Sequence, residues 1–349
     1  MAATTTRVRW GILGTADIAR TAFIPAVRLT DSGEVRAVGS RSREKAQEYA
    51  KAHGIPVAYD SYDAVLDDPE IDAVYIPLPN TLHAEWIIKA AHAGKHVFCE
   101  KPLTMTYEEA KKAVQACKDA GVMLVEAFVY RFHRQSRRLR EIIENGEIGD
   151  VLHTDARFHY SFRGDRDNIR VRPEVGGGAL LDIGCYVLSW TRFVMGGLPL
   201  AVAATSVTDE PTGVDKTTVA TLRFSRGRTA NVSSGIRMFG GQQATIYGTD
   251  GQIDVSQPFH PNPPQGGWPG ARVTVFKRGE VLDRSVPVDK PPFYEAVETI
   301  QRSILKDEPL PFDTMEDALD QALLMEACRL SAEEDRWVDL PSIDCRAVS

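Results

Sequence analysis

The first 150 residues alternate between short apolar runs and longer amphipathic stretches. The apolar runs are rich in β-branched residues and predict buried strands at 8–13, 34–38, 73–76, 96–99 and 122–125. Between them, apolar positions recur at helical spacing over 18–28, 43–52, 82–93, 107–120 and 136–145. This alternation predicts a parallel sheet with right-handed crossovers and helices on both faces.

The pattern changes after Gly149. Apolar and polar residues then alternate along 151–160, 201–208, 217–224, 229–236 and 272–276, with turn signals between the runs, which is typical of an antiparallel sheet. Helical spacing returns at 293–306 and 314–333, and the Pro- and Gly-rich segment 258–270 predicts a long surface loop, either a lid or an interface loop. We therefore expect an α/β fold of two domains: a doubly wound parallel sheet over 1–149, and an α+β domain with an open, largely antiparallel sheet over 150–349.

Composition narrows the class of protein. The 349 residues carry 41 Lys and Arg against 48 Asp and Glu, a formal net charge of −7, which argues against nucleic acid or an anionic membrane as partner. The start of the chain lacks an apolar secretory segment and the rest lacks a membrane-spanning run, so we expect a cytoplasmic protein. Five widely spaced cysteines suit reduced thiols, and eight scattered histidines show no recurring ligand spacing, so we expect no metal site.

A candidate phosphate loop follows the first predicted strand. Gly14, Thr15, Ala16, Asp17 and Ile18 lead from the strand into a helix, where backbone N–H groups and the helix dipole favour a pyrophosphate. Ala16 stands where a glycine is usual, and its Cβ should displace the pyrophosphate outward or require a different local path. The loop alone therefore fits an ordinary strand–helix turn as well.

The end of the second strand bears on cofactor choice. An NAD site places an acidic residue there to bind the ribose 2′-hydroxyl, whereas this chain has Ser40 and Arg41, with Lys45 one turn further on. A hydroxyl and cations suit a 2′-phosphate. The alternative is a solvated helix start, although cations are unfavourable at that end of a helix. The sequence therefore favours NADP over NAD.

Lys101, Asp182 and Tyr186 suggest proton transfer. Lys101, between Glu100 and Pro102, follows the strand at 96–99. It lies with Asn80 and His83, which follow the strand at 73–76, at the edge where such sheets bind ligands. Asp182 and Tyr186 are four residues apart and share one face of a helix. An ammonium favours the phenolate of a nearby tyrosine, so the three can act together. A capping aspartate and a buried tyrosine are the alternative.

These blocks together resemble the Gfo/Idh/MocA oxidoreductases. The segments 11–19, 75–80 with His83, 100–102 and 176–186 occur in that family's order, and the resemblance extends from Arg7 to about Leu340. It implies an N-terminal Rossmann domain, a C-terminal domain with an open sheet, and pyridine-nucleotide redox chemistry on sugars or related polyols. It also implies a homodimer or homotetramer.

The resemblance assigns roles residue by residue. It implies Lys101, Asp182 and Tyr186 as catalytic residues, with Tyr186 where many members have histidine, as in the branch of NADP-dependent D-xylose dehydrogenases, dimeric dihydrodiol dehydrogenases and glucose–fructose oxidoreductase. It places Ser40 and Lys45 near the 2′-phosphate. The other implied contacts are Leu78, Asn80, His83, Glu100 and Lys101 for the cofactor, and Tyr130, Arg131, His133, Lys101, Asp182 and Tyr186 for the substrate.

The leading hypothesis is an NADP-dependent sugar oxidoreductase that oxidises C1 of an aldopyranose to the lactone. Tyr186 as phenolate accepts the hydroxyl proton, Lys101 stabilises it, and Asp182 hydrogen-bonds the substrate or the lysine. A second hypothesis is NADPH-dependent reduction of a keto-sugar or nucleotide-keto-sugar, with a diphosphate held by arginines such as Arg163, Arg166, Arg170 and Arg172. A third is a non-catalytic NADP-binding sensor.

Overall fold

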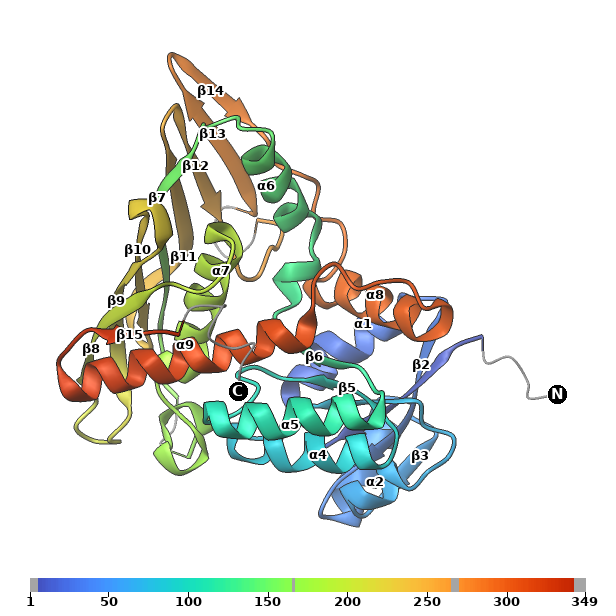
Figure 1. Ribbon diagram of the computed structural model, residues 1–349. Coiled ribbons are helices and arrows are strands. Elements are labelled where there is room, and N and C mark those ends of the chain that lie inside the picture. The colour runs from blue at the N-terminus through green and yellow to red at the C-terminus, as the bar shows by residue number, and fades with distance from the viewer. Residues whose placement is uncertain (1–5, 165–166, 265–269, 342–349) are drawn as a thin grey trace. The chain divides into compact units, whose positions relative to one another are not determined.

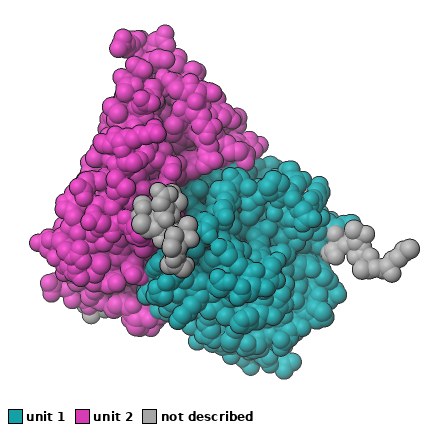
Figure 2. Space-filling view, in the orientation of Figure 1, with its two compact units in different colours: residues 1–132, 290–319 teal, residues 133–289, 320–349 magenta. Residues whose placement is uncertain are grey.

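The chain divides into two compact units. The computed structural model describes residues 6–164, 167–264 and 270–341. The first unit comprises Met1–Phe132 and Lys290–Leu319, and the second comprises His133–Asp289 and Asp320–Ser349 (Figure 2). The sequence pattern places a single boundary after Gly149. In the structure the division falls at Phe132, and a segment from the last quarter of the chain belongs to the first unit.

The first unit contains a six-stranded parallel sheet (Figure 1). Its spatial order is β3 (Val57–Tyr59), β2 (Gly33–Gly39), β1 (Val8–Leu13), β4 (Ala73–Ile76), β5 (His96–Cys99) and β6 (Leu124–Glu126). The strand order reverses between β1 and β4, the point at which doubly wound sheets bind ligands. The predicted doubly wound parallel sheet is confirmed.

Helices cover both faces of this sheet, because its strands are apolar on both sides. In β4, Ala73 and Tyr75 belong to one buried cluster, and Val74 and Ile76 to the other. The first cluster includes the π-helix η1 (Ala19–Phe23), α1 (Ile24–Arg28) and α8 (Pro292–Lys306), and the second includes α3 (Tyr62–Leu66), α4 (His83–His92) and α5 (Tyr107–Ala120). Helix α2 (Arg43–Ala52) follows β2.

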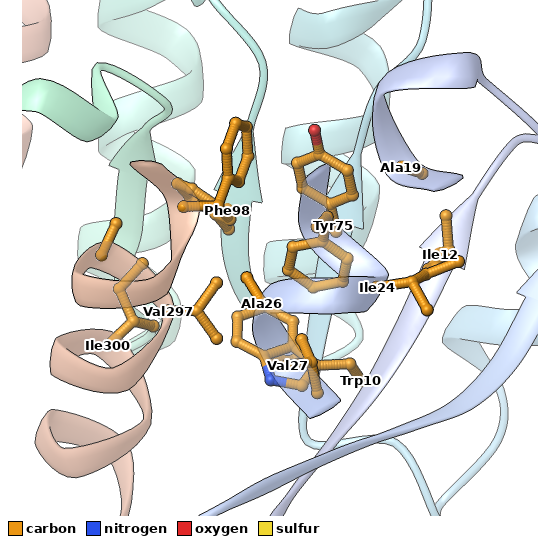
Figure 3. Packing of buried hydrophobic residues seen from close by; sticks show 14 of the residues in the cluster. Trp10, Ile12, Ala19, Ile24, Ala26, Val27, Tyr75, Phe98, Val297 and Ile300 are labelled. Atoms are coloured by element: carbon orange, nitrogen blue, oxygen red, sulfur yellow. The ribbon is translucent and has the colours of Figure 1, made fainter. Parts of the chain in front are cut away.

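Helix α8 belongs to the first unit through its apolar face. Val297 and Ile300 are almost wholly buried, and they lie in one cluster with Trp10 and Phe98 of the sheet (Figure 3). Burying two such side chains contributes roughly 1.5–3 kcal/mol each. This packing explains why a segment so late in the sequence completes the core of the N-terminal sheet.

The second unit contains a nine-stranded mixed sheet. Its order is β14 (Glu280–Asp283), β13 (Arg272–Lys277), β12 (Gly251–Ser256), β11 (Arg237–Gly248), β7 (Val151–Ser161), β10 (Thr229–Gly235), β9 (Asp215–Arg223), β8 (Ala201–Thr208) and β15 (Val338–Asp339). Only the β7–β10 pair is parallel among these described strands, so the expectation of a largely antiparallel sheet is confirmed. Helices α6 (Arg134–Glu144) and α7 (Cys185–Met195) lie in this unit, and α9 (Thr314–Glu334) begins in the first unit and ends in the second.

Several absences hold for the described residues. None of their helices is long and apolar enough to cross a membrane, and no cluster of three or more potential metal ligands occurs among them. Four cysteines are buried free thiols, and Cys345 lies outside the described residues. Burial raises the pKa of Cys117 and of Cys328 to about 12 each, so these thiols stay protonated.

Candidate functional site

The turn after β1 requires glycine at its first position. Gly14 has φ of 110°, and a Cβ placed there would lie 3.1 Å from the Leu78 side chain, which follows β4. The Gly14 N–H donates to the Gly39 carbonyl at the end of β2, at 2.8 Å. Three strand ends therefore meet around Gly14, at the point where the strand order reverses.

The rest of this turn is open to an anion. Thr15 and Ala16 are half-buried and Asp17 and Ile18 are exposed, and the first N–H groups of a helix have no acceptor within it. The Ala16 carbonyl accepts a hydrogen bond from Tyr49 Oη at 3.2 Å, which fixes the path of the chain at the residue that departs from the glycine pattern. The turn combines a fixed path with accessible backbone at the positive end of a helix.

Unpaired cations lie beyond the end of β2. Ser40 is buried, and its Oγ accepts from the Ser42 N–H at 3.3 Å. Ser42 caps α2 by accepting from the Lys45 N–H, also at 3.3 Å. The Arg41 and Lys45 side chains are exposed, and neither has an ion-pair partner among the described residues. Two positive charges are thus available to a ligand here.

The Glu100–Pro102 turn is anchored in the core. Tyr75, which is fully buried in the sheet (Figure 3), donates from its hydroxyl to Glu100 Oε1 at 2.6 Å. Lys101 follows directly, is half-buried, and precedes a cis peptide bond to Pro102. This hydrogen bond therefore ties the residue before Lys101 to the core of the sheet.

His83 lies beneath the turns rather than on their surface. Its side chain is fully buried, and its two ring nitrogens lie 2.8 Å from the carbonyl oxygens of Pro102 and Leu78. These two contacts join the turns after β4 and β5. Burial lowers its pKa. Direct cofactor contact by His83 stays a prediction. Asn80, half-buried at the start of the short helix η2 (Asn80–Leu82), lies at the rim.

Two of the predicted substrate residues are buried within the first unit. Tyr130 and Arg131 lie on the short helix η3 (Val129–Phe132) and are almost inaccessible. The Arg131 guanidinium pairs with Asp317 at 2.9 Å and lies 4.1 Å from the centre of the Phe312 ring. In the second unit, His133 is also buried and accepts from the Gln135 N–H at 3.1 Å as the cap of α6. The contacts described here are structural, so substrate binding by these residues stays a prediction.

In the second unit, Asp182 and Tyr186 each have a partner. Asp182 lies on the π-helix η6 (Leu180–Gly184). Its Oδ2 accepts a hydrogen bond from the Tyr160 hydroxyl and forms an ion pair with Arg170 Nε at 3.3 Å. Burial and the Asp182 charge raise the pKa of Tyr160, which keeps it a donor. The Tyr186 hydroxyl lies 3.1 Å from His260 Nε2.

The glycine run before Asp182 has a structural reason. Gly178 has φ of 120°, and a Cβ there would lie 2.0 Å from Asp215 Oδ1. Asp215 Oδ2 accepts from the Leu180 N–H at 2.8 Å and so holds the start of the helix that carries Asp182. A side chain at Gly178 would displace this carboxylate and with it the helix start.

Sequence reasoning missed Tyr160 and His260 and gave Arg170 a different role. Tyr160 is one of several aromatic residues in an alternating strand, and His260 lies in the Pro-rich segment after β12. Neither position has a sequence signal of its own, because each meets its partner through a contact between segments that are far apart in the chain. Part of that Pro-rich segment, 265–269, lies outside the described residues, as does Arg166.

Comparison with known proteins decides the family. The profile of the oxidoreductase family with an NAD-binding Rossmann fold matches residues 8–128, and that of the Gfo/Idh/MocA C-terminal domain matches residues 136–254. The D-xylose 1-dehydrogenase (NADP(+)) 2 of Haloferax volcanii is 36% identical over 332 residues, covering 95% of this chain and 99% of that protein. This chain belongs to the Gfo/Idh/MocA oxidoreductase family.

Solved structures of Gfo/Idh/MocA relatives match most of this chain. A 3-ketoreductase from Actinomadura kijaniata in complex with NADP and TDP-benzene has a TM-score of 0.85 at 30% identity, covering 93% of this chain and 98% of that one. The aldose–aldose oxidoreductase from Caulobacter crescentus, complexed with glycerol, has a TM-score of 0.87 at 27% identity, covering 96% and 100%. The predicted family, fold class and oxidoreductase class are confirmed.

Proposed function

We propose that this protein is an NADP-dependent sugar oxidoreductase that oxidises C1 of an aldopyranose to the lactone. The observation that carries the proposal is that Asp182 and Tyr186 each have a polar partner that holds the reactive atom, Tyr160 for Asp182 and His260 for Tyr186. The resemblance to the family adds Lys101 as the third proton-transfer residue. Two of the relatives described above are named for aldose chemistry. A polyol or sugar hydroxyl is therefore the preferred substrate group.

The residues of the first unit fit a phosphorylated dinucleotide. The turn Gly14, Thr15, Ala16, Asp17 and Ile18 would hold the pyrophosphate, because its N–H groups lie at a helix start and Gly14 adopts a positive φ that favours glycine. Ser40, Arg41 and Lys45 would hold the 2′-phosphate, because the two cations are unpaired among the described residues. Leu78, Asn80, Glu100 and Lys101 would contact the nicotinamide half, with His83 behind them. When bound, NADP+ would supply the hydride acceptor for the carbon that carries the substrate hydroxyl.

The protein's own residues then move the proton. Tyr186 Oη, as phenolate, accepts the proton of the substrate hydroxyl, and the Lys101 ammonium favours that phenolate and orients the hydroxyl. Asp182 hydrogen-bonds the substrate or the lysine. Tyr160 and Arg170 fix the orientation of its carboxylate, which supports this role.

The arginines after β7 favour a sugar without a diphosphate. Arg170 is paired with Asp182 at 3.3 Å and Arg172 with Glu174 at 2.7 Å, so a nucleotide-sugar diphosphate would have to compete with carboxylates for both. Reduction of a keto-sugar with NADPH uses the same residues in reverse. It is therefore the second arm of the test rather than a different site.

Turnover of sugars by wild type and by Tyr186→Phe tests the proposal. Wild type is assayed with aldopyranoses and NADP+, and with keto-sugars and NADPH. We expect Tyr186→Phe to lower kcat by at least about 100-fold, because a positioned proton acceptor contributes that much or more. Its Kd for NADPH should not change.

Unchanged turnover in Tyr186→Phe would remove Tyr186 from the mechanism. A wild-type protein that binds NADPH and turns over neither class of sugar would instead be a sensor.

We also propose that the protein is a homodimer or homotetramer. The exposed face of the second sheet, which carries Val207 and Val219 at 49% and 48% exposure, supports this.

A further inference from the structure

We propose that His260 carries the proton between Tyr186 and solvent. The inference rests on the function proposed above, in which Tyr186 exchanges a proton with the substrate. Nothing in the sequence pattern singles out this histidine, so the structural contact alone carries it.

The two atoms in contact are those between which the proton would be transferred. Tyr186 Oη and His260 Nε2 lie 3.1 Å apart, within hydrogen-bonding distance, and the two ring centres are 4.8 Å apart. Tyr186 is only 5% exposed, whereas His260 is partly exposed. A proton on the buried phenol therefore has an imidazole beside it that reaches water.

The chain on both sides of His260 is held by side-chain hydrogen bonds. Gln242 Oε1, on β11, accepts from the N–H groups of both Phe259 and His260 at 2.9 Å each. Asn262 Nδ2 donates to the His260 carbonyl at 3.0 Å. Phe259 is fully buried and stacks on Phe158, with ring centres 5.4 Å apart. The histidine is thus preorganised beside Tyr186.

One residue of this segment adopts an unfavourable backbone conformation. Gln257 has φ of 49°, a left-handed conformation that costs a residue with a side chain. Gln135 Nε2 donates to the Gln257 carbonyl at 3.3 Å, and Gln257 Oε1 accepts from the Asn262 N–H at 3.2 Å. Such residues persist where surrounding contacts fix them, often at functional sites.

The proton balance is simple. In the oxidation, the substrate C–H and O–H bonds break, the hydride goes to NADP+ and the hydroxyl proton forms the O–H bond of Tyr186. Tyr186 then gives this proton to the lone pair of His260 Nε2, and the imidazolium releases its Nδ1 proton to water. Proton exchange with water then returns the imidazole to the Nδ1–H tautomer, with no net change in protons. The products are the lactone, NADPH and one proton in solution, and the phenolate is restored. Reduction runs through the same atoms in reverse.

Two variants of His260 separate proton transfer from positioning. His260→Ala removes the imidazole, and His260→Gln keeps an amide near Nε2 that hydrogen-bonds Tyr186 but does not carry a proton onward. We expect both to lower kcat by about 10-fold or more, less than loss of the acid–base residue itself. The solvent deuterium isotope effect on kcat should rise, and the Kd for NADPH should stay constant. His92→Gln, on the exposed end of α4, is the matched control and should behave as wild type.

Added imidazole gives the sharpest readout. It should restore turnover to His260→Ala and leave Tyr186→Phe unrescued. Wild-type kcat in His260→Gln would overturn the proton transfer, because hydrogen bonding alone would then suffice. A loss in His260→Ala that imidazole does not restore would overturn it as well.

A spectroscopic test needs neither cofactor nor turnover. In the cofactor-free protein labelled with 15N-histidine, Tyr186→Phe should shift the His260 Nε2 resonance, which is assigned by its loss in His260→Gln. An unshifted resonance would overturn the contact. Absence of wild-type turnover with every sugar would overturn the proposed function and this inference with it, whereas wild-type turnover with an unimpaired His260→Ala would overturn this inference alone.

Discussion

At the scale of single residues, the site depends on backbone positions as much as on reactive side chains. Gly14 illustrates this, because its φ of 110° is unfavourable for any other residue and a Cβ there would lie only 3.1 Å from the Leu78 side chain. We expect Gly14→Ala to raise the Kd for NADPH by about 5- to 30-fold, since the conformation costs a non-glycine residue roughly 1–2 kcal/mol. Isothermal titration calorimetry measures this.

Gly94→Ala is the matched control for that change. Gly94 also has a positive φ, 69°, but no atom lies within 4 Å of an added Cβ, and it follows the C-cap of α4. It should lower the melting temperature and leave the Kd unchanged. An equal loss of affinity in both variants would contradict a specific role for Gly14.

The sequence locates reactive residues better than it assigns their contacts. Lys101, Asp182 and Tyr186 follow from motif and helical spacing. The sequence places His83 at the rim but does not tell contact with a cofactor from contact with the carbonyls of Leu78 and Pro102. The sequence suggests a surface or substrate role for Arg131, because its hydrogen-bond partner, Asp317, comes 186 residues later in the chain. Long-range contacts of this kind leave no local pattern.

At the scale of elements, one ion pair ties β1 to the start of β4. Arg9 donates to Asp72 from its backbone N–H and from Nε, at 2.8 and 3.0 Å, and its Nη2 lies 2.8 Å from Oδ1. Burial raises the pKa of Asp72, but these hydrogen bonds and the Arg9 charge outweigh it and lower the pKa overall. The ionised form is thus favoured by folding.

Because folding lowers the pKa of Asp72, the stability of the protein depends on pH. The contribution of Asp72 is fully present above the ordinary carboxyl pKa of about 4, and it is lost as pH falls through the lowered value. Asp72→Asn should lower the free energy of unfolding at neutral pH by about 1–2 kcal/mol, because a partly exposed charged hydrogen bond is worth that much. It should also flatten the loss of stability below pH 4 or so, as measured by urea unfolding. An equally steep acid loss in the variant would contradict the assignment.

Elements with strong local patterns were predictable and those without were not. The apolar runs at 8–13, 73–76 and 96–99 coincide with β1, β4 and β5. Strand β3 has only three residues, and β11 contains Gly240 and Gly241 at a register shift against β7, so neither shows a clear alternation. Periodicity predicts α8, but it does not show which sheet that helix covers.

At the scale of the whole molecule, the charge of the protein opposes a phosphorylated cofactor. The formal net charge is −7, so affinity for the 2′-phosphate has to come from local cations. A double variant, Arg41→Gln with Lys45→Gln, should raise the Kd for NADPH by about 10-fold or more and leave that for NADH unchanged, because a charge-assisted hydrogen bond contributes roughly 1.5–3 kcal/mol. Fluorescence titration with both nucleotides checks this. Equal losses for the two would place the phosphate elsewhere.

Assembly is the other property of the whole molecule that the sheet suggests. If the exposed face of the second sheet joins copies of the chain, Val219→Lys should shift the protein toward monomer in sedimentation velocity, because it buries a charge in the interface. Leu29→Lys, at a position 50% exposed in the first unit, serves as control and should leave the mass unchanged. Identical masses for both variants and wild type would exclude this face as the interface.

The most direct test of the proposed function is product analysis with wild-type protein. The purified protein is incubated with single aldopyranoses and NADP+, NADPH formation is followed by absorbance, and the sugar product is identified by 13C NMR. The account predicts one NADPH formed for each lactone, with oxidation confined to C1. NADPH formation with oxidation at another carbon, or no turnover of any aldopyranose alongside rapid reduction of a keto-sugar, would contradict it.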